Sequence, residues 1–174
     1  RLSSGKTIGY EALLRWDHPK FGLILPTRFV EAAEASGLIV PVGAWVMRDA
    51  CQEAALWDNK LIVSVNVSAV QISAPGFVEM VCAALADSGL SPARLEIEIT
   101  ETALLDDKGA ARDVLQTLRA MGIRIALDDF GMGHASFAYL LAFPFDKIKI
   151  DRSFIADIAW RPESRTIVEA VAGM

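Results

Sequence analysis

The sequence Leu61-Ile-Val-Ser-Val-Asn-Val67 decides the fold class. It is a short run dominated by apolar and β-branched residues, which predicts a strand buried on both of its faces. Such strands are typical of parallel sheets, because helices cover both faces of those sheets. Amphipathic stretches at residues 41–58 and 75–88 flank the run and predict two of these helices.

The same alternation of short apolar runs and longer amphipathic runs extends along the whole chain. It predicts strands at residues 8–14, 61–67, 94–100, 123–127 and 146–150. It predicts helices at residues 26–36, 41–58, 75–88, 108–121 and 136–142, and a last one from residue 161 onward. Connections of a few residues between these elements imply a parallel sheet covered by helices, and therefore an α/β fold.

Two α/β architectures fit this order: an open doubly wound sheet and a closed barrel. No G-x-G-x-x-G loop follows the first predicted strand, which counts against the dinucleotide-binding version of the open sheet. A TIM-like (β/α)8 barrel has eight strands and about 250 residues. We count about five predicted strands, so if the fold is a barrel, residues 1–174 form one domain that contains only part of it.

The composition narrows the class of partner and the cellular location. The chain carries a net charge of -5, so it has no broad positive field to attract DNA or RNA. Its longest apolar stretch, residues 38–47, falls short of the roughly 20 residues of a bilayer span, and no signal peptide is visible. Cys51 and Cys82 lie in helical patterns and are predicted to be buried, reduced thiols. We expect a cytoplasmic protein, or the cytoplasmic portion of a membrane-anchored one.

Polar residues fall at the ends of the apolar strands. The residues that end four successive strands are Asn66, Glu98, Asp128 with Asp129, and Lys149 with Asp151. The steps from Asn66 to Glu98, to Asp128 and to Lys149 are 32, 30 and 21 residues. One βα unit of an eight-stranded barrel takes about 30 residues. Successive units would therefore bring these side chains to the same rim.

Such a rim of acidic side chains indicates a metal site. A charge at the end of an apolar strand is costly unless it is paired or bound to a metal, and oxygen ligands suit Mg²⁺ or Mn²⁺. The adjacent carboxylates Asp128 and Asp129 suit a pair of metal ions. Each residue alone could instead be a solvated strand end or a helix N-cap, where Asp and Asn are common. For the whole set, the metal site is the better explanation.

Five ordered motifs carry a resemblance to a known family. They are Glu11-Ala-Leu-Leu-Arg15-Trp16, Asn66-Val-Ser68 with Gln71, Glu98-Ile-Thr-Glu101, Asp128-Asp-Phe-Gly131 and Lys149-Ile-Asp-Arg-Ser-Phe154. In order and spacing they resemble the EAL domain family over essentially the whole chain. The resemblance implies a barrel of the EAL type and a phosphodiesterase that hydrolyses the bacterial second messenger cyclic di-GMP to linear pGpG.

The resemblance also implies a two-metal site that uses Mg²⁺ or Mn²⁺. By resemblance, Glu11, Asn66, Glu98 and Asp128 hold one ion, and Asp128 with Asp129 serves the second. The ions lower the pKa of a bound water and neutralise charge that builds on the phosphate.

Four further residues receive roles from the same resemblance. Lys149 is expected beside the attacking water, and Glu101 is expected to brace the loop after Asp129. Arg15 is expected to contact a ligand phosphate, with a surface ion pair to Asp17 as the alternative. Leu13 is expected to touch a guanine base, with core packing as an equal alternative.

The loop after Asp129 departs from the family pattern Asp-Phe-Gly-Thr-Gly-Tyr-Ser-Ser. Met132, His134 and Ala135 replace hydroxyl residues there, which leaves open whether the parent protein is active or needs a partner domain. His18 and His134 have no partner at ligand spacing, so we expect a structural histidine and a loop residue. By the same resemblance, this is a partial EAL domain: the family's first strand is expected before residue 1, and its later Glu-Gly-Val-Glu and Gln-Gly segments are expected beyond residue 174.

Three functions therefore compete. The first is a cyclic di-GMP phosphodiesterase, which the intact set of ligands favours. The second is a degenerate EAL domain that binds cyclic di-GMP without cutting it, and the third is a purely structural module. We expect a homodimer, fusion to a sensory or GGDEF domain outside this chain, and no activity from these 174 residues by themselves.

Overall fold

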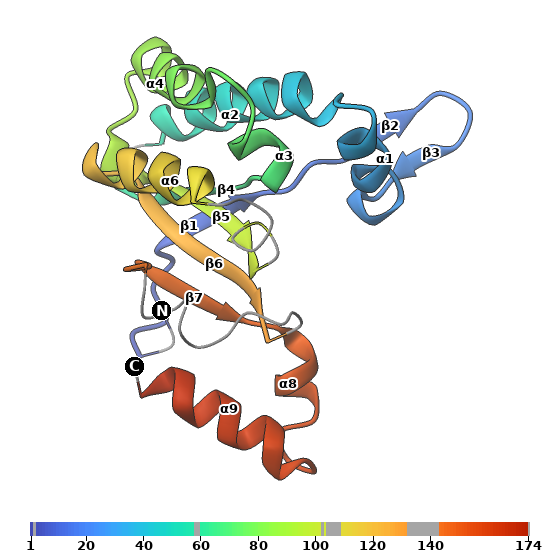
Figure 1. Cartoon of the computed structure of the whole chain (residues 1–174), viewed down its shortest axis with the longest axis vertical. Helices are drawn as coiled ribbons and strands as arrows, with labels where there is room; N and C mark the ends of the chain where they lie inside the picture. Colours follow the sequence, from blue (N-terminus) through green and yellow to red (C-terminus); the bar gives the residue numbers. More distant parts are fainter. Residues whose placement is uncertain (2, 58–59, 102, 104–108, 132–142, 174) are drawn as a thin grey trace.

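The structure is a computed structural model that describes every residue except 2, 58–59, 102, 104–108, 132–142 and 174. Its centre is a five-stranded sheet in the order β1-β4-β5-β6-β7, in which all four pairings are parallel. The strands are β1 (Gly9–Ala12), β4 (Ile62–Asn66), β5 (Leu95–Thr100), β6 (Arg124–Phe130) and β7 (Lys147–Ile150). The sheet curls as it passes from β1 to β7 (Figure 1), so the predicted incomplete α/β barrel is confirmed.

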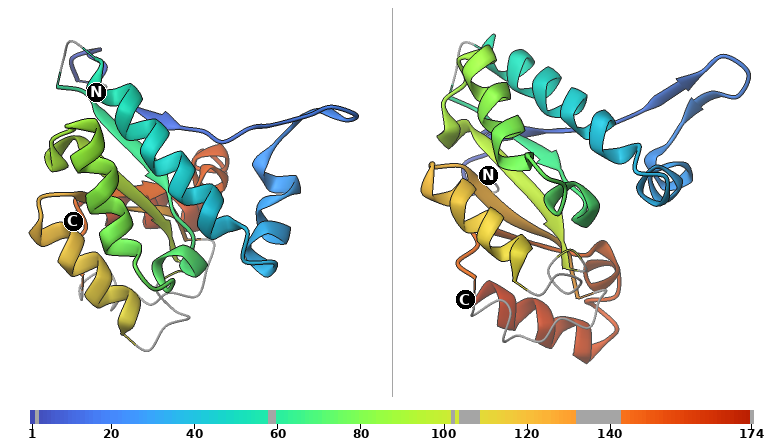
Figure 2. Two further views of the ribbon diagram at one scale, coloured as in Figure 1. Left: turned by 90° about the horizontal axis from the view of Figure 1, so that it is seen from above. Right: turned by 45° about the horizontal axis from the view of Figure 1, so that its top comes forward.

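Three long helices form a layer on the outer face of this sheet (Figure 2). They are α2 (Ile39–Ala55), α4 (Phe77–Ser88) and α6 (Ala110–Ala120). The strands turn their apolar residues toward the helices, and these residues, all at most 3% exposed, include Val63, Val65, Leu95, Ile97, Ile99, Ile125 and Leu127. Because strand side chains alternate between faces, the residues between them point into the concave face. That face carries polar side chains, among them Glu96 and Glu98.

The predicted helix at residues 26–36 is not one helix. Phe29 has a φ of −136°, which separates the 3₁₀ turn η1 (Pro26–Arg28) from α1 (Val30–Ala35). Just before it, β2 (Trp16–His18) and β3 (Gly22–Ile24) form an antiparallel hairpin that the sequence did not indicate. His18 Nδ1 accepts bonds from the backbone N–H groups of Lys20 and Phe21, so His18 is structural, as predicted.

Two short helices were also missed. The first, α3 (Ala69–Ile72), begins at a capping box in which Ser68 and Gln71 bond each other's backbone N–H groups. The second, α8 (Arg152–Ala156), is capped by Asp151, and a 3₁₀ turn η2 (Pro92–Arg94) leads into β5. The local capping bonds stabilise these helices, but each is too short to show an apolar period.

The remaining boundaries differ from the predictions by a few residues. β6 extends to Phe130, three residues beyond the predicted end, and so includes Asp128 and Asp129. The last helix, α9 (Pro162–Ala172), starts one residue after the predicted residue 161, and its proline lies in the first turn as predicted. Gly89 and Gly122 follow α4 and α6 with positive φ angles, which explains why these helices stop there. The helix predicted at 136–142 lies outside the described residues.

The burial of the two cysteines agrees with the sequence prediction only in part. Cys51 is fully buried, and burial raises the pKa of its thiol to about 11. Cys82 is only half-buried, against the prediction, and its Sγ lies 3.6 Å from Met121 Sδ.

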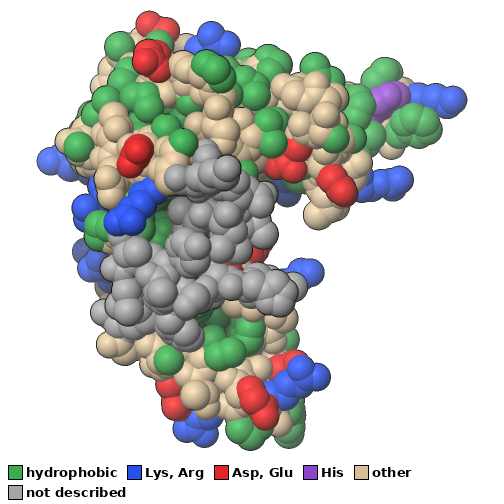
Figure 3. All heavy atoms as spheres, viewed as in Figure 1, with side chains coloured by type: hydrophobic (Ala, Val, Ile, Leu, Met, Phe, Trp, Pro, Cys, Tyr) green, Lys and Arg blue, Asp and Glu red, His purple; other side chains and the backbone are tan. Residues whose placement is uncertain are grey.

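On the face drawn in Figure 3, acidic and basic side chains are interspersed. None of the helices in the described part of the chain has the length and apolarity to span a bilayer.

Candidate metal centre

The carboxyl ends of the parallel strands bring the predicted ligands to one place. Glu11 lies on β1, Glu98 on β5 and Asp128 on β6. Carboxylate oxygens of these three residues all lie within 4.8 Å of one another. Parallel strands end at the same edge of a sheet, so residues that are more than 100 positions apart in sequence become neighbours.

Asn66 completes this group from the end of β4. Its Nδ2 donates a hydrogen bond of 2.7 Å to Oε1 of Glu11, and it lies opposite Glu98 in the strand register. The amide therefore holds the Glu11 carboxylate against the other two. The structure brings together all four residues that the family resemblance assigned to the first metal ion.

Lys149 points into the middle of the carboxylates. Its Nζ lies 2.6 Å from Glu98 Oε2, 2.9 Å from Asp128 Oδ2 and 3.5 Å from Glu11 Oε2. Burial by itself would lower the pKa of Lys149, but the hydrogen bonds and charges of Glu98 and Asp128 outweigh it and raise the pKa. Lys149 is therefore a cation held by three carboxylates.

Two acids of the rim, the buried Glu98 and the exposed Asp129, are shifted toward their protonated forms. Burial is the largest cause that raises the pKa of Glu98, and the charges of Glu11 and Asp128 add to it, while Lys149 opposes it. Burial also raises the pKa of Asp129, together with the charges of Asp128 and Asp151. An added cation would relieve this repulsion, which is the electrostatic signature of a site built for positive charge.

Asp129 lies beside the three-carboxylate cluster and does not belong to it. It has a φ of 53°, which is rare outside glycine, and its backbone N–H donates to Oδ1 of Asp128. Asp151 accepts bonds from the N–H and hydroxyl of Ser153, and these bonds lower its pKa. Asp151 is therefore a helix cap, which was the alternative interpretation for a strand-end aspartate.

Glu101 contacts the first residue after β6. It is 3% exposed, and its Oε2 accepts a hydrogen bond of 3.1 Å from the N–H of Gly131. Gly131 has a φ of 102°, and a Cβ at this position would lie 2.5 Å from a ring atom of Phe154. The glutamate thus holds the start of the loop, while the altered positions Met132, His134 and Ala135 lie outside the described residues.

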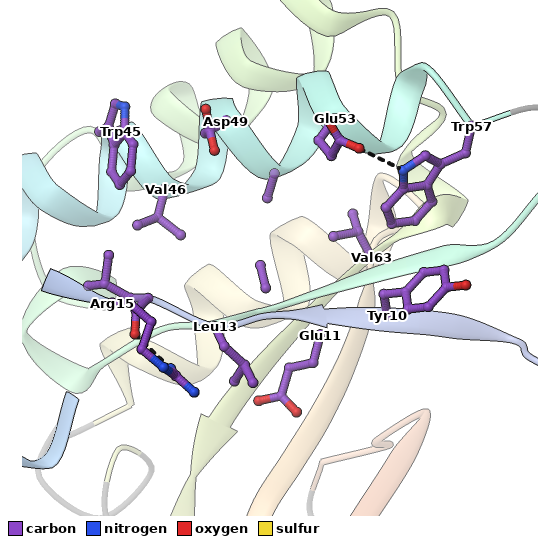
Figure 4. A pocket seen from close by; sticks show the side chains of 13 residues that line it. Tyr10, Glu11, Leu13, Arg15, Trp45, Val46, Asp49, Glu53, Trp57 and Val63 are labelled. Carbon is purple, nitrogen blue, oxygen red and sulfur yellow. Dashed lines mark hydrogen bonds between the residues drawn. The ribbon is translucent and has the colours of Figure 1, made fainter. Parts of the chain in front are cut away.

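The candidate ligand-binding residues follow β1 directly and point to the same side of the chain as Glu11. Figure 4 shows Glu11, Leu13 and Arg15 projecting from the side of the chain that faces away from α2. Arg15 is exposed, and its guanidinium donates a 2.8 Å hydrogen bond to the backbone carbonyl of Leu14, which is a neutral acceptor. Leu13 is 56% exposed, which excludes the core packing considered for it.

A second polar layer was not predicted. It lies below the cluster on the same concave face and consists of Ser64, Glu96, Arg124 and Lys147. Ser64, Glu96 and Lys147 each precede a predicted site residue by two positions in the same strand. The alternation of strand side chains was the signal that could have identified this layer from the sequence.

The donor set fits a divalent cation with a preference for oxygen. Three carboxylates and one amide converge, one of the carboxylates is almost fully buried, and a single lysine balances part of their charge. Magnesium and manganese bind such oxygen-rich groups in preference to sulfur or nitrogen sites.

A curled parallel sheet with its polar side chains at the carboxyl ends of the strands defines a TIM-type α/β barrel with an acidic mouth. The EAL domain model matches residues 1–174, and the chain belongs to the EAL domain family.

Relatives and solved structures agree with this assignment. The chain is 48% identical over its whole length to an uncharacterized signaling protein of Caulobacter vibrioides, and covers 22% of that protein. It is 41% identical over 98% of its length to the bifunctional diguanylate cyclase/cyclic di-GMP phosphodiesterase MucR of Pseudomonas aeruginosa, and covers 26% of it. The chain therefore spans about a quarter or less of the length of these relatives.

Among solved structures, the MucR phosphodiesterase in complex with cyclic di-GMP superposes with a TM-score of 0.91 at 42% identity. The match covers 97% of this chain and 70% of that one. The FimX EAL domain of Pseudomonas aeruginosa bound to cyclic di-GMP matches with a TM-score of 0.86 at 26% identity, over 98% of this chain and 69% of that one.

Proposed function

We propose that this chain is the catalytic part of a phosphodiesterase that hydrolyses cyclic di-GMP to linear pGpG with Mg²⁺ or Mn²⁺. The observation that carries the proposal is the convergence of Glu11, Glu98 and Asp128 around the ammonium of Lys149. The likeness to MucR, whose structure is a cyclic di-GMP complex, supports the choice of substrate.

In this proposal the acidic rim holds two ions. Glu11, Asn66, Glu98 and Asp128 would hold the first, and Asp128 with Asp129 would hold the second. Bound ions would lower the pKa of a water and neutralise the developing phosphate charge. Glu101 would keep Asp129 and the following loop in place through its bond to Gly131.

Lys149 would donate a hydrogen bond to the attacking water. The pKa of Lys149 is raised, so it stays protonated and is a poor acceptor for the proton of that water. Its role is therefore to orient the water and to stabilise its deprotonated form, as the resemblance implies.

Arg15 and Leu13 would bind the dinucleotide beside the ions. Both are exposed on the side of the chain that carries Glu11, so both would face a dinucleotide whose phosphate is bound at the carboxylates. The planar fork of Arg15 suits two phosphate oxygens, and Leu13 offers an apolar surface to a guanine.

A second candidate function is a non-catalytic cyclic di-GMP receptor. The replaced loop residues Met132, His134 and Ala135 favour it, because this loop follows the proposed second-metal ligand Asp129. The likeness to the FimX EAL domain bound to cyclic di-GMP is compatible with either function. A homodimer, fusion to a sensory or GGDEF domain and a cytoplasmic location complete the proposal.

Incubation of the full-length protein with cyclic di-GMP and Mn²⁺ separates these functions. Turnover to the linear dinucleotide that disappears in Glu11→Ala, and persists in the matched control Glu79→Ala on the exposed face of α4, supports the enzyme. Binding measured by calorimetry without turnover supports the receptor. If the protein neither binds nor hydrolyses cyclic di-GMP, both functions are contradicted.

A further inference from the structure

The pairing between β6 and β7 is irregular at the point where Lys149 lies. Ala126 pairs with Lys147 and Leu127 pairs with Ile148, but Ile150 pairs with Phe130. Two residues of β6, Asp128 and Asp129, thus face the single residue Lys149. Such a bulge leaves the ladder locally disrupted, so the backbone pairing does not by itself fix Lys149.

An ion pair between the half-buried Lys147 and the buried Glu96 lies directly below this bulge. Lys147 Nζ lies 2.5 Å from Oε1 of Glu96, which is 1% exposed. Ser64 donates a 2.7 Å hydrogen bond to the same oxygen, and Arg124 Nε lies 3.6 Å from the other oxygen. Lys147 is the nearer of these two cations. Without it the buried Glu96 carboxylate would keep only the more distant Arg124, so the pair holds the Lys147 side chain against β5.

The two lysines of β7 bridge to β5 along the same diagonal. Lys147 reaches Glu96, and Lys149 reaches Glu98, and in both cases the partners are 51 residues apart. Both bridges cross β6, where Ala126 lies between Glu98 and Lys147 in the register. Ala126 is fully buried, and its methyl group leaves space that a larger side chain would fill.

We propose that the Glu96–Lys147 ion pair, which spans from β5 to β7 across Ala126 of β6, positions Lys149 in the acidic rim. Glu96 and Lys147 are positioning residues in this assignment, because neither lies among the three clustered carboxylates. The pair holds β7 at Lys147, two residues before Lys149. The backbone pairing between β6 and β7 is interrupted at Lys149 itself. The activity part of this inference rests on the proposed phosphodiesterase function, but the structural part does not.

The test compares Lys147→Met, which keeps most of the stem and removes the charge, with Lys147→Arg and Glu96→Gln in the full-length protein. Lys60→Met, at an exposed lysine before β4, is the matched control. We expect Lys147→Met to lower kcat at least about tenfold with an unchanged KM, because small misplacements of a reacting group are costly. Lys147→Arg should restore most of the activity, and Lys60→Met should behave as the parent.

Hydrogen exchange of the metal-free protein gives a readout that does not depend on activity. In Lys147→Met and Glu96→Gln, we expect faster exchange at the amides of Lys149 and Ile150, with α2 and α4 still protected. The double variant should resemble the single ones, because both remove the same bridge. Unchanged exchange in β7 overturns the inference, and so does a uniform loss of protection through the helices, which identifies general destabilisation. If the parent protein shows no turnover, the proposed function fails, and the exchange data still decide the positioning role.

Discussion

Lys149 donates a hydrogen bond of 2.6 Å to Oε2 of Glu98, a carboxylate that is almost fully buried. Asp128 accepts a second bond of 2.9 Å from the same ammonium. The lysine is therefore the cation that balances the acidic rim in this structure. We therefore expect the metal affinity, the stability and the activity of the protein to depend on this one side chain in different directions.

We expect Lys149→Met to separate metal binding from turnover. Without the lysine, the carboxylates have no competing cation, so Mn²⁺ should bind at least as tightly as in the parent. Turnover should fall at least about a hundredfold, because the attacking water loses its donor. Calorimetry with Mn²⁺ and a cyclic di-GMP assay measure both, with the exposed Lys6→Met as control. Loss of Mn²⁺ binding in Lys149→Met would show that the lysine supports the metal site.

The same variant should lower the stability of the metal-free protein. Lys149→Met leaves Glu98 buried without its partner, and breaking a buried pair costs about 3 kcal/mol. Since the lysine is itself 29% exposed, solvent reduces this cost. Urea unfolding with and without Mn²⁺ measures the effect, and saturating Mn²⁺ should recover most of the loss. Equal stability of variant and parent without metal would contradict the role of Lys149 as the balancing cation.

Divalent ions should stabilise the protein more as the pH rises. The folded state raises the pKa of Glu98, mainly through burial, so the metal-free fold binds protons more tightly than the unfolded chain does. The stability that protonated Glu98 contributes to the metal-free fold is therefore lost as the pH rises through the raised pKa of Glu98. Mn²⁺ binds the charged carboxylate, so its binding is favoured at the same high pH. The thermal shift caused by Mn²⁺ should be larger at about pH 7.5 than at about pH 5. In Glu98→Gln, the thermal shift caused by Mn²⁺ should differ less between the two pH values. A thermal shift in the parent protein that becomes smaller as the pH rises would contradict this prediction.

Gly131→Ala should destabilise the protein for two separable reasons. The φ of 102° strains any residue with a side chain, and the new Cβ would lie 2.5 Å from Phe154. Gly89→Ala is a matched control, because its φ of 70° carries the strain and no heavy atom lies within 4 Å of its Cβ. We expect a loss of about 1 kcal/mol for Gly89→Ala and at least twice as much for Gly131→Ala in urea unfolding. Equal losses would mean that Phe154 moves aside without cost.

Glu101→Ala and Glu101→Gln should differ, because only the second keeps an acceptor for the Gly131 N–H. The alanine variant leaves that N–H without its partner, at a cost of about 1–3 kcal/mol, and should lower the affinity for the second metal ion. The glutamine variant should retain most of the stability. Thermal unfolding and Mn²⁺ titration of both variants check this, and identical behaviour would remove the bracing role.

The sequence determined the architecture and the position of the rim. The alternation of short apolar runs, such as residues 61–67, with longer amphipathic runs, such as residues 75–88, predicted the parallel sheet and its covering helices. Glu98 and Asp128 lie about one βα unit apart, so their meeting followed from the repeat of the barrel. The short hairpin β2–β3 escaped prediction because three-residue strands carry too little of a period to recognise.

Only the tertiary structure decided which charges pair across the sheet. A period of two shows that Lys147 and Lys149 share a face with Glu96 and Glu98, but not which lysine reaches which glutamate. That choice depends on the register of three strands, on the bulge at Asp128 and Asp129, and on the curl of the sheet. These arise from packing between segments far apart in the chain, for which no local pattern exists.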